Sequence, residues 1–177
     1  NHVRLFANYR DTFKPAAFDF NLVENEGLLK PETARSYEGG VKTRAAGGRL
    51  DLEASAFHMD FNNLVTSATV AGLPVLQNTG TTVFKGFETA AAMNLPRHVT
   101  ARVTYSFHDA RFVNFVKEFD PGVPTQLAGK RIEMSARHLF SAGLTVAPER
   151  GVVASLVVKY TGERKLNMRN PAPAGAF

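Results

Sequence analysis

The chain of 177 residues contains no cysteine, no long hydrophobic run and no dense run of basic residues. The lack of cysteine fits the periplasmic side of a bacterium but does not by itself assign a compartment. No apolar stretch approaches the roughly 18 residues that a membrane-spanning helix needs. This excludes helical membrane spans. It leaves a membrane β-barrel open, because barrel strands carry apolar residues only at every second position.

The positive charge of the chain is dispersed. The formal net charge is +5 and the sequence pI is about 9.7, yet the 21 basic residues are scattered along the whole length. No segment has the pattern of a recognition helix, and helical periodicity with caps is absent throughout. The sequence therefore argues against nucleic acid as a partner.

Residue types that carry chemistry are present, but not in catalytic or metal-binding patterns. The five histidines lack metal-ligand spacing. Asp60 begins a short acidic and amide stretch, but the glycine and distal glutamate of a calcium loop are missing. Ser106–Asp109 contains the residue types of a catalytic triad, although neighbours on a strand point to opposite faces. We therefore predict no enzyme activity, no metal site and no cofactor.

The most informative pattern is the alternation of apolar and polar residues in the segment from Leu50 to Met59. Leu50, Leu52 and Ala54 fall on one face, while Asp51 and Glu53 fall on the other. Period-two alternation indicates a strand with one apolar and one polar face. About ten residues also match the tilted span of a membrane β-strand.

Seven segments have this character, so the sequence predicts an all-β fold built as an antiparallel meander. The connections alternate between short turns rich in glycine or proline and long links. Membrane barrels show this alternation because their periplasmic turns are short and their external loops are long. The link 62–81 is expected to hold a hairpin of its own. The predicted strands are Val3–Asp11, Ala34–Ala45, Arg49–Phe61, Thr82–Asn94, Val99–Ala110, Arg137–Ala147 and Val152–Gly162.

Alternation alone leaves a second architecture open. A soluble β-sandwich also has one apolar and one polar face on each strand. The alternative hypothesis is therefore a secreted β-sandwich that binds a glycan or a protein partner.

Three segments resemble the TonB-dependent receptors of the bacterial outer membrane. LKPETARSYEGGVK (29–42) resembles the start of a mid-barrel strand in that family, and QNTGTTVFKGFETAA (77–91) resembles another strand. LAGKRIEMSARHLFSAGL (127–144) resembles a loop-to-strand passage, although Met134–Ala136 replaces the usual proline neighbourhood. The segments occur in the family's order over nearly the whole chain.

The resemblance implies a section of about seven strands from a large transmembrane β-barrel in the outer membrane. In that family about 22 strands close around an N-terminal plug. We therefore expect that the plug, the first half of the barrel and the last strands lie outside this chain. The resemblance further implies uptake of a scarce solute, most often a ferric siderophore. TonB would supply the energy and contact the protein through the absent N-terminal region.

Aromatic and basic residues in two long links are the candidate ligand contacts. Cations beside aromatic rings suit anionic complexes with apolar parts. The alternative is that these links only pack on one another. The candidates are Phe13, Lys14, Arg111, Phe115 and Lys117, with Phe18 in the same link as Phe13.

Strand parity also predicts which side chains face lipid and which face the barrel interior. Leu52, Ala54, Val103, Leu144 and Leu156 are expected to point outward, and Glu53, Ser55, Arg102, Ser141 and Ser155 inward. Lys85 shares the outward parity of its neighbours Val83 and Phe87, which fits a membrane only if its amine reaches an interface. Glu38, Lys42, Glu53 and Glu88 are expected on the polar face, where a ladder of cross-strand pairs is favoured over a direct role in transport.

Overall fold

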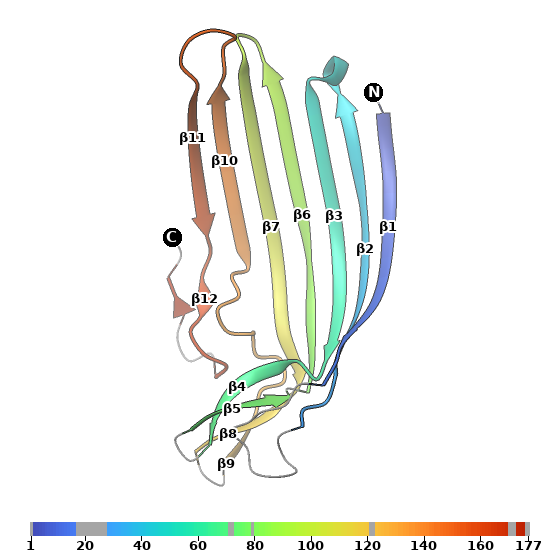
Figure 1. Ribbon diagram of the computed structural model, residues 1–177, viewed down its shortest axis with the longest axis vertical. Coiled ribbons are helices and arrows are strands. Elements are labelled where there is room, and N and C mark those ends of the chain that lie inside the picture. The colour runs from blue at the N-terminus through green and yellow to red at the C-terminus, as the bar shows by residue number, and fades with distance from the viewer. Residues whose placement is uncertain are drawn as a thin grey trace.

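One curved antiparallel sheet of seven strands dominates the structure (Figure 1). The computed structural model describes residues 2–16, 28–70, 73–78, 80–120, 123–169 and 173–175. The strands lie in the order β1-β2-β3-β6-β7-β10-β11, so neighbours in the sheet follow one another along the chain apart from inserted hairpins. Their bounds are β1 His2–Lys14, β2 Glu32–Ala45, β3 Leu50–Asn62, β6 Thr81–Leu95, β7 Val99–Asn114, β10 His138–Val146 and β11 Ala154–Thr161.

This arrangement confirms the predicted antiparallel meander. A sandwich is wrong, because the long strands form a single sheet and every other sheet of the described residues has two strands. The only helix in the described part of the chain is a 3-10 turn, η1 (Ala46–Gly48), so no described helix is long and apolar enough to cross a membrane. Two of its residues, Gly47 and Gly48, have φ angles of 65° and 87°, which glycine adopts without strain.

Short two-stranded sheets lie within the long links. The hairpin predicted in the link 62–81 is present as β4 (Val65–Val70) and β5 (Leu73–Asn78). A second hairpin, β8 (Val116–Asp120) with β9 (Val123–Gln126), was not predicted. The proline in β9 makes this strand hard to predict from the sequence, because proline cannot donate a hydrogen bond to a neighbouring strand. The remaining pair is β12 (Arg164–Lys165) with β13 (Pro173–Ala174).

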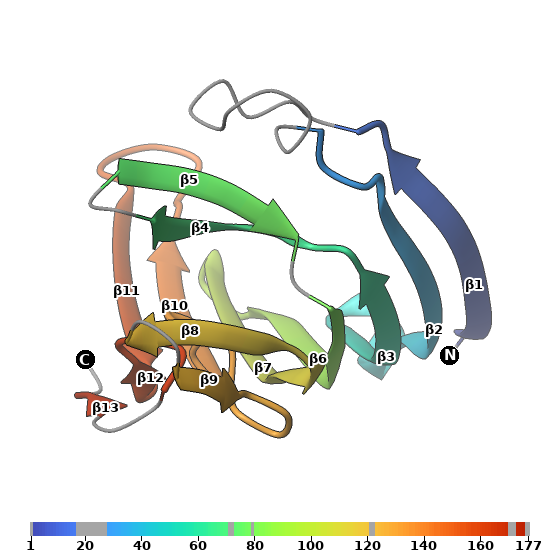
Figure 2. The same cartoon turned by 90° about the horizontal axis from the view of Figure 1, so that it is seen from below.

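The two ends of the sheet differ. The connections β2–β3, β6–β7 and β10–β11 are short turns at one end, whereas both inserted hairpins lie at the other (Figure 1). Viewed from the hairpin end, the sheet curves, and β4–β5 reaches across its open concave side (Figure 2). The hairpins therefore stand at the mouth of the curved wall.

The strand register places the two predicted sets of side chains on opposite faces. Leu52, Ala91 and Val103 form one cross-strand row, and Glu53 begins the neighbouring row on the other face. The polar rows line hollows of about 590 and 470 Å³ on the concave side, which Arg102 and Thr104 share. The polar face is thus the concave face.

The convex face carries an apolar band that ends sharply. One of its last rows joins Ala56, Phe87, Phe107 and His138 across β3, β6, β7 and β10. The following row is largely polar: Tyr9, Tyr37, His58, Lys85 and Asp109. Lys85 therefore has the outward parity predicted, but it lies at the edge of the band and not within it.

Gly86 is needed where β6 approaches its neighbours. A Cβ added at this position would overlap the carbonyl oxygen of Phe107. The same Cβ would lie only 3.0 Å from the ring of Phe57, which is on the paired strand. The Phe57 ring thus covers a glycine on the adjacent strand, an arrangement known to stabilise glycine in sheets. At Gly143 an added Cβ would meet only ordinary contacts at 3.6 Å.

We therefore expect Gly86→Ala to lower the yield of assembled barrel, because overpacking costs about 1–3 kcal/mol. Gly143→Ala is the matched control and should assemble like the parent. Heat-modifiable mobility of outer-membrane extracts on gels measures the folded fraction. Equal yields for the two variants would contradict the steric argument.

Candidate functional site

A small hydrophobic cluster holds the hairpin end of the wall together. Phe112, at the end of β7, is 1% exposed, and Leu127 is 0% exposed. Phe115 and Met168 complete the buried cluster, and Phe119 and Ile132 pack against it. The cluster joins β7, the β8–β9 hairpin and the segment after β11 into one packed unit.

The segment after β9 extends the sheet beyond the start of β10. The Gly129 amide donates to the Phe112 carbonyl at 2.8 Å, and the Ile132 amide donates to the Ala110 carbonyl at 3.0 Å. Gly129 has a φ of 77°, which favours glycine in this turn. Arg111 and Arg131 are bridge partners, so their side chains lie on the same face. The AGKR motif (128–131) therefore pairs with the end of β7 as an additional strand would.

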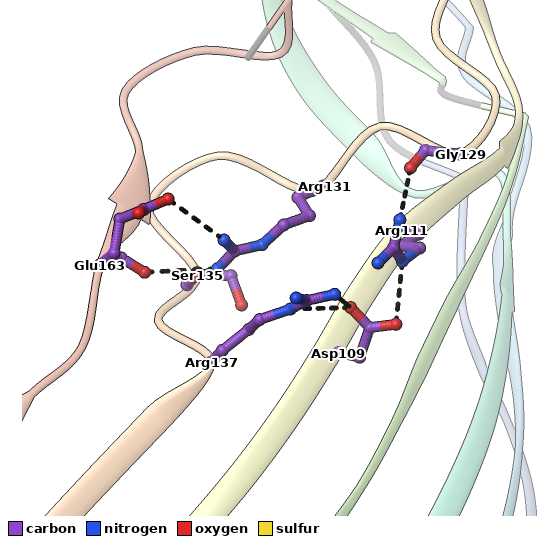
Figure 3. Close-up of polar contacts among 7 residues, drawn as sticks. All are labelled: Asp109, Arg111, Gly129, Arg131, Ser135, Arg137 and Glu163. Carbon is purple, nitrogen blue, oxygen red and sulfur yellow. Dashed lines mark hydrogen bonds and ion pairs between the residues drawn. The ribbon is translucent and has the colours of Figure 1, made fainter. Parts of the chain in front are cut away.

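Asp109 is the centre of an ionic network at this end (Figure 3). Its side chain is 9% exposed, and each carboxylate oxygen accepts from a different arginine. Arg137 Nη2 lies 2.8 Å from Oδ1, and Arg111 Nε lies 2.8 Å from Oδ2. Arg111 also donates to the Gly129 carbonyl at 2.9 Å. The network thereby ties β7 to the first residue before β10 and to the AGKR turn.

Arg131 extends the network toward the segment after β11. It donates to the Ser135 carbonyl at 2.9 Å and lies 3.7 Å from a carboxylate oxygen of Glu163. Lys165 contacts the same Glu163 oxygen at 3.0 Å. Burial lowers the pKa of the Arg131 guanidinium, and repulsion by Arg137 lowers it further. The hydrogen bond from Lys165 is the main reason that the pKa of Glu163 is also lowered.

The concave face carries a ladder of cross-strand polar pairs. Lys42 and Glu53, on β2 and β3, form an ion pair at 2.7 Å. Glu38 accepts from Asn8 at 3.3 Å, and Glu88 contacts His108 at 3.1 Å. These contacts support the favoured interpretation of the four polar residues as a ladder along the wall.

The family model for the β-barrel of TonB dependent receptor-like proteins matches residues 1–176. The chain belongs to this family. The sequence resemblance is therefore confirmed, and the curved sheet is a section of an outer-membrane receptor barrel. The members of the family are transport receptors.

Individual relatives are receptors of similar kind. The ferrioxamine B receptor of Salmonella typhimurium is 26% identical over 158 residues, covering 89% of this chain and 21% of that protein. The metal-pseudopaline receptor CntO of Pseudomonas aeruginosa is 31% identical over 116 residues, covering 61% of this chain and 15% of the receptor. The chain thus spans about a fifth or less of the length of these relatives.

Solved structures share the fold. The ferric yersiniabactin uptake receptor FyuA from Yersinia pestis superposes with a TM-score of 0.73 at 16% identity, over 99% of this chain and 26% of that one. BauA, the ferric preacinetobactin receptor from Acinetobacter baumannii, gives a TM-score of 0.68 at 16% identity, over 99% and 26% of the two chains. At such identities the likeness concerns the barrel wall.

The five predicted ligand contacts do not form one cluster in this receptor section. Phe13 and Lys14 lie at the end of β1, where Lys14 pairs with Glu32 at 3.0 Å. Arg111 and Phe115 belong to the ionic network and the hydrophobic cluster, respectively. Lys117 alone lies on the β8–β9 hairpin, and Phe18 is outside the described residues. Contact of these residues with a solute stays a prediction.

The network around Asp109 was not identified from the sequence. Arg131 and Arg137 lie in the segment 127–144 that resembles the receptor family, but their partners Asp109 and Glu163 lie more than 20 residues away on either side. Among the described residues, no group of three or more histidine, aspartate or glutamate side chains is placed to hold a metal ion. The chemistry of this end is therefore that of charge pairing and aromatic contact.

Proposed function

We propose that this chain is part of the wall of a receptor that takes up a ferric siderophore, or a similar scarce metal complex, with energy from TonB. The observation that carries the proposal is the match to the receptor barrel over residues 1–176. The relatives named above are receptors for ferrioxamine B and for a metal–pseudopaline complex. TonB would act on a plug that lies outside this chain.

The position of the long links supports a role in solute recognition. In outer-membrane barrels the short turns face the periplasm and the long loops face the exterior. The β4–β5 and β8–β9 hairpins both lie at the end of the sheet opposite the short turns (Figure 1). A solute arriving from outside would meet these hairpins before it reached the polar concave wall.

Within this region, the face of Phe119 is the best candidate contact. The Arg169 guanidinium lies 4.3 Å from the centre of the Phe119 ring, and the Lys117 ammonium lies 5.5 Å from it. Arg169 is also paired with Asp120 at 2.8 Å, while its side chain remains 44% exposed. Two cations held against one aromatic ring suit an anionic complex that has aromatic or apolar parts. Of the predicted contacts, Lys117 is therefore retained as the main proposal.

The uptake proposal is tested in a strain that lacks the gene carrying this sequence. Under iron limitation, the strain should fail to take up at least one radiolabelled ferric siderophore from a chemically varied panel. Expression of the gene should restore that uptake only while TonB is active. Equal uptake of every tested complex with and without the gene would overturn the siderophore assignment.

Lys117→Gln should weaken solute binding by the full-length receptor about two- to fivefold, because the exposed contact of the ammonium with an aromatic part of the solute would be lost, and such a contact is worth about 0.5–1 kcal/mol. Lys130→Gln is the matched control, because Lys130 is an exposed lysine in the same link but is not one of the two cations over the Phe119 ring. Whole-cell binding at 0 °C, normalised to receptor abundance, provides the measurement. Deleting the whole segment 113–119 would not test solute contact, because the deletion would also remove the buried Phe115 and disturb the packing. Unchanged affinity in Lys117→Gln would remove this residue from the site.

A further inference from the structure

A concentration of positive charge lies at the end of the apolar band, on the convex face. We call it the basic patch. Two carboxylates lie within it, so cations exceed anions by a wide margin. The patch consists of Lys85, Arg111, Arg131, Arg137 and Lys165, with Asp109 and Glu163 between them.

Both carboxylates are already paired with cations of the patch. Both oxygens of Asp109 accept from arginines, and one oxygen of Glu163 is shared by Arg131 and Lys165. Lys85 is the register partner of Asp109 on β6, yet its ammonium forms no ion pair or hydrogen bond with any described residue. Repulsion from Arg137 and Arg111 contributes to the lowered pKa of Arg131, after the larger effect of burial. The patch is therefore short of negative charge.

The patch also lies at a defined depth in the membrane. The row containing Lys85 and Asp109 directly follows the row of Phe87, Phe107 and His138 at the edge of the apolar band. Aromatic residues mark the interface between hydrocarbon and headgroups in barrels. Because the long links face the exterior, this is the interface of the outer leaflet. The side chains of Arg111 and Arg137 are 37% and 33% exposed, so part of each guanidinium remains accessible there.

We propose that the basic patch binds the phosphate group of a lipid in the outer leaflet. Guanidinium groups bind phosphate oxygens with paired hydrogen bonds. The flexible side chain of Lys85 allows its ammonium to extend from the edge of the apolar band toward the lipid headgroups. The patch is bounded on the β3 side by Asp60, whose carboxylate is hydrogen-bonded to His58. The convex face is opposite the polar concave wall, so this lipid site is separate from the route of the solute. The proposal rests on the membrane location and not on the identity of the solute.

The test uses the purified full-length receptor in detergent, titrated with lipid A as a phosphate-bearing probe and followed by native mass spectrometry. Lys85→Gln should raise the apparent Kd for lipid A about fivefold, the effect of one cation near a charged membrane surface. Lys159→Gln, in the same row as Ser141 on the concave face, is the matched control and should not change the Kd. Phosphatidylcholine, whose phosphate is shielded by choline, should bind weakly to all three proteins.

Three results would overturn the proposal. One is an unchanged Kd in Lys85→Gln, and another is an equal loss in Lys159→Gln. The third is displacement of lipid A by equimolar inorganic phosphate, which would identify a free anion as the ligand. If Lys85→Gln fails to assemble, the lipid phosphate that co-purifies with the unaltered receptor is measured instead. Fewer than one lipid phosphate per receptor would contradict a bound lipid. Solute uptake is not a readout here, so failure of this proposal leaves the uptake proposal standing.

Discussion

Leu52→Arg is expected to reduce the amount of receptor assembled in the outer membrane severely. Leu52 lies on the convex face, in a row with Ala91 and Val103 within the apolar band. An arginine at the middle of the lipid face of a barrel costs about 2–4 kcal/mol, because its charge loses contact with water. Heat-modifiable mobility and surface labelling of whole cells would measure the assembled fraction.

Ser55→Arg is the matched control for Leu52→Arg. Ser55 is on the same strand but on the concave face, where its register partner on β6 is Glu88. An arginine there can remain hydrated and pair with that carboxylate, so assembly should be close to that of the parent. Comparable losses in both variants would show that the assignment of the two faces is wrong.

Leu127→Ala is expected to loosen the external end of the wall while leaving the membrane strands assembled. Leu127 is fully buried against Phe112 and Phe115, and its amide donates to the Phe115 carbonyl at 2.8 Å. Truncation of a buried leucine to alanine costs about 2–5 kcal/mol, through lost apolar burial and the cavity left behind. The cost falls on the packing of the β8–β9 hairpin, because the sheet is held by its own ladder of hydrogen bonds.

Limited proteolysis of intact cells measures this loosening. Leu127→Ala should speed cleavage within residues 115–136 and weaken solute binding, at unchanged receptor abundance. Leu166→Ala provides the comparison, because Leu166 is 57% exposed and loses little packing on truncation. If cleavage rates of the two variants agree, the buried cluster does not order this end of the receptor.

The strands and their two faces were largely determined by the sequence. Alternation with period two is a local property, and it holds wherever one face of a sheet is apolar and the other polar. It therefore located all seven long strands, with the largest difference at β7, which continues four residues past Ala110 to Asn114. It also assigned Leu52 and Glu53 to opposite faces correctly.

The arrangement of the external end was decided only by the tertiary structure. Asp109 meets Arg137 because β7 pairs with β10, and Arg131 reaches Glu163 because the chain returns after β11. Phe115 has the composition of a ligand contact but is buried, since Leu127 and Met168 come from distant parts of the chain to cover it. Strand parity alone places the charged Lys85 on the lipid face, where a charge is unfavourable. The cross-strand register shows that Lys85 lies at the edge of the apolar band, beside Asp109. Charge pairs and depth in the membrane depend on which strands become neighbours, and no local pattern of residues contains that information.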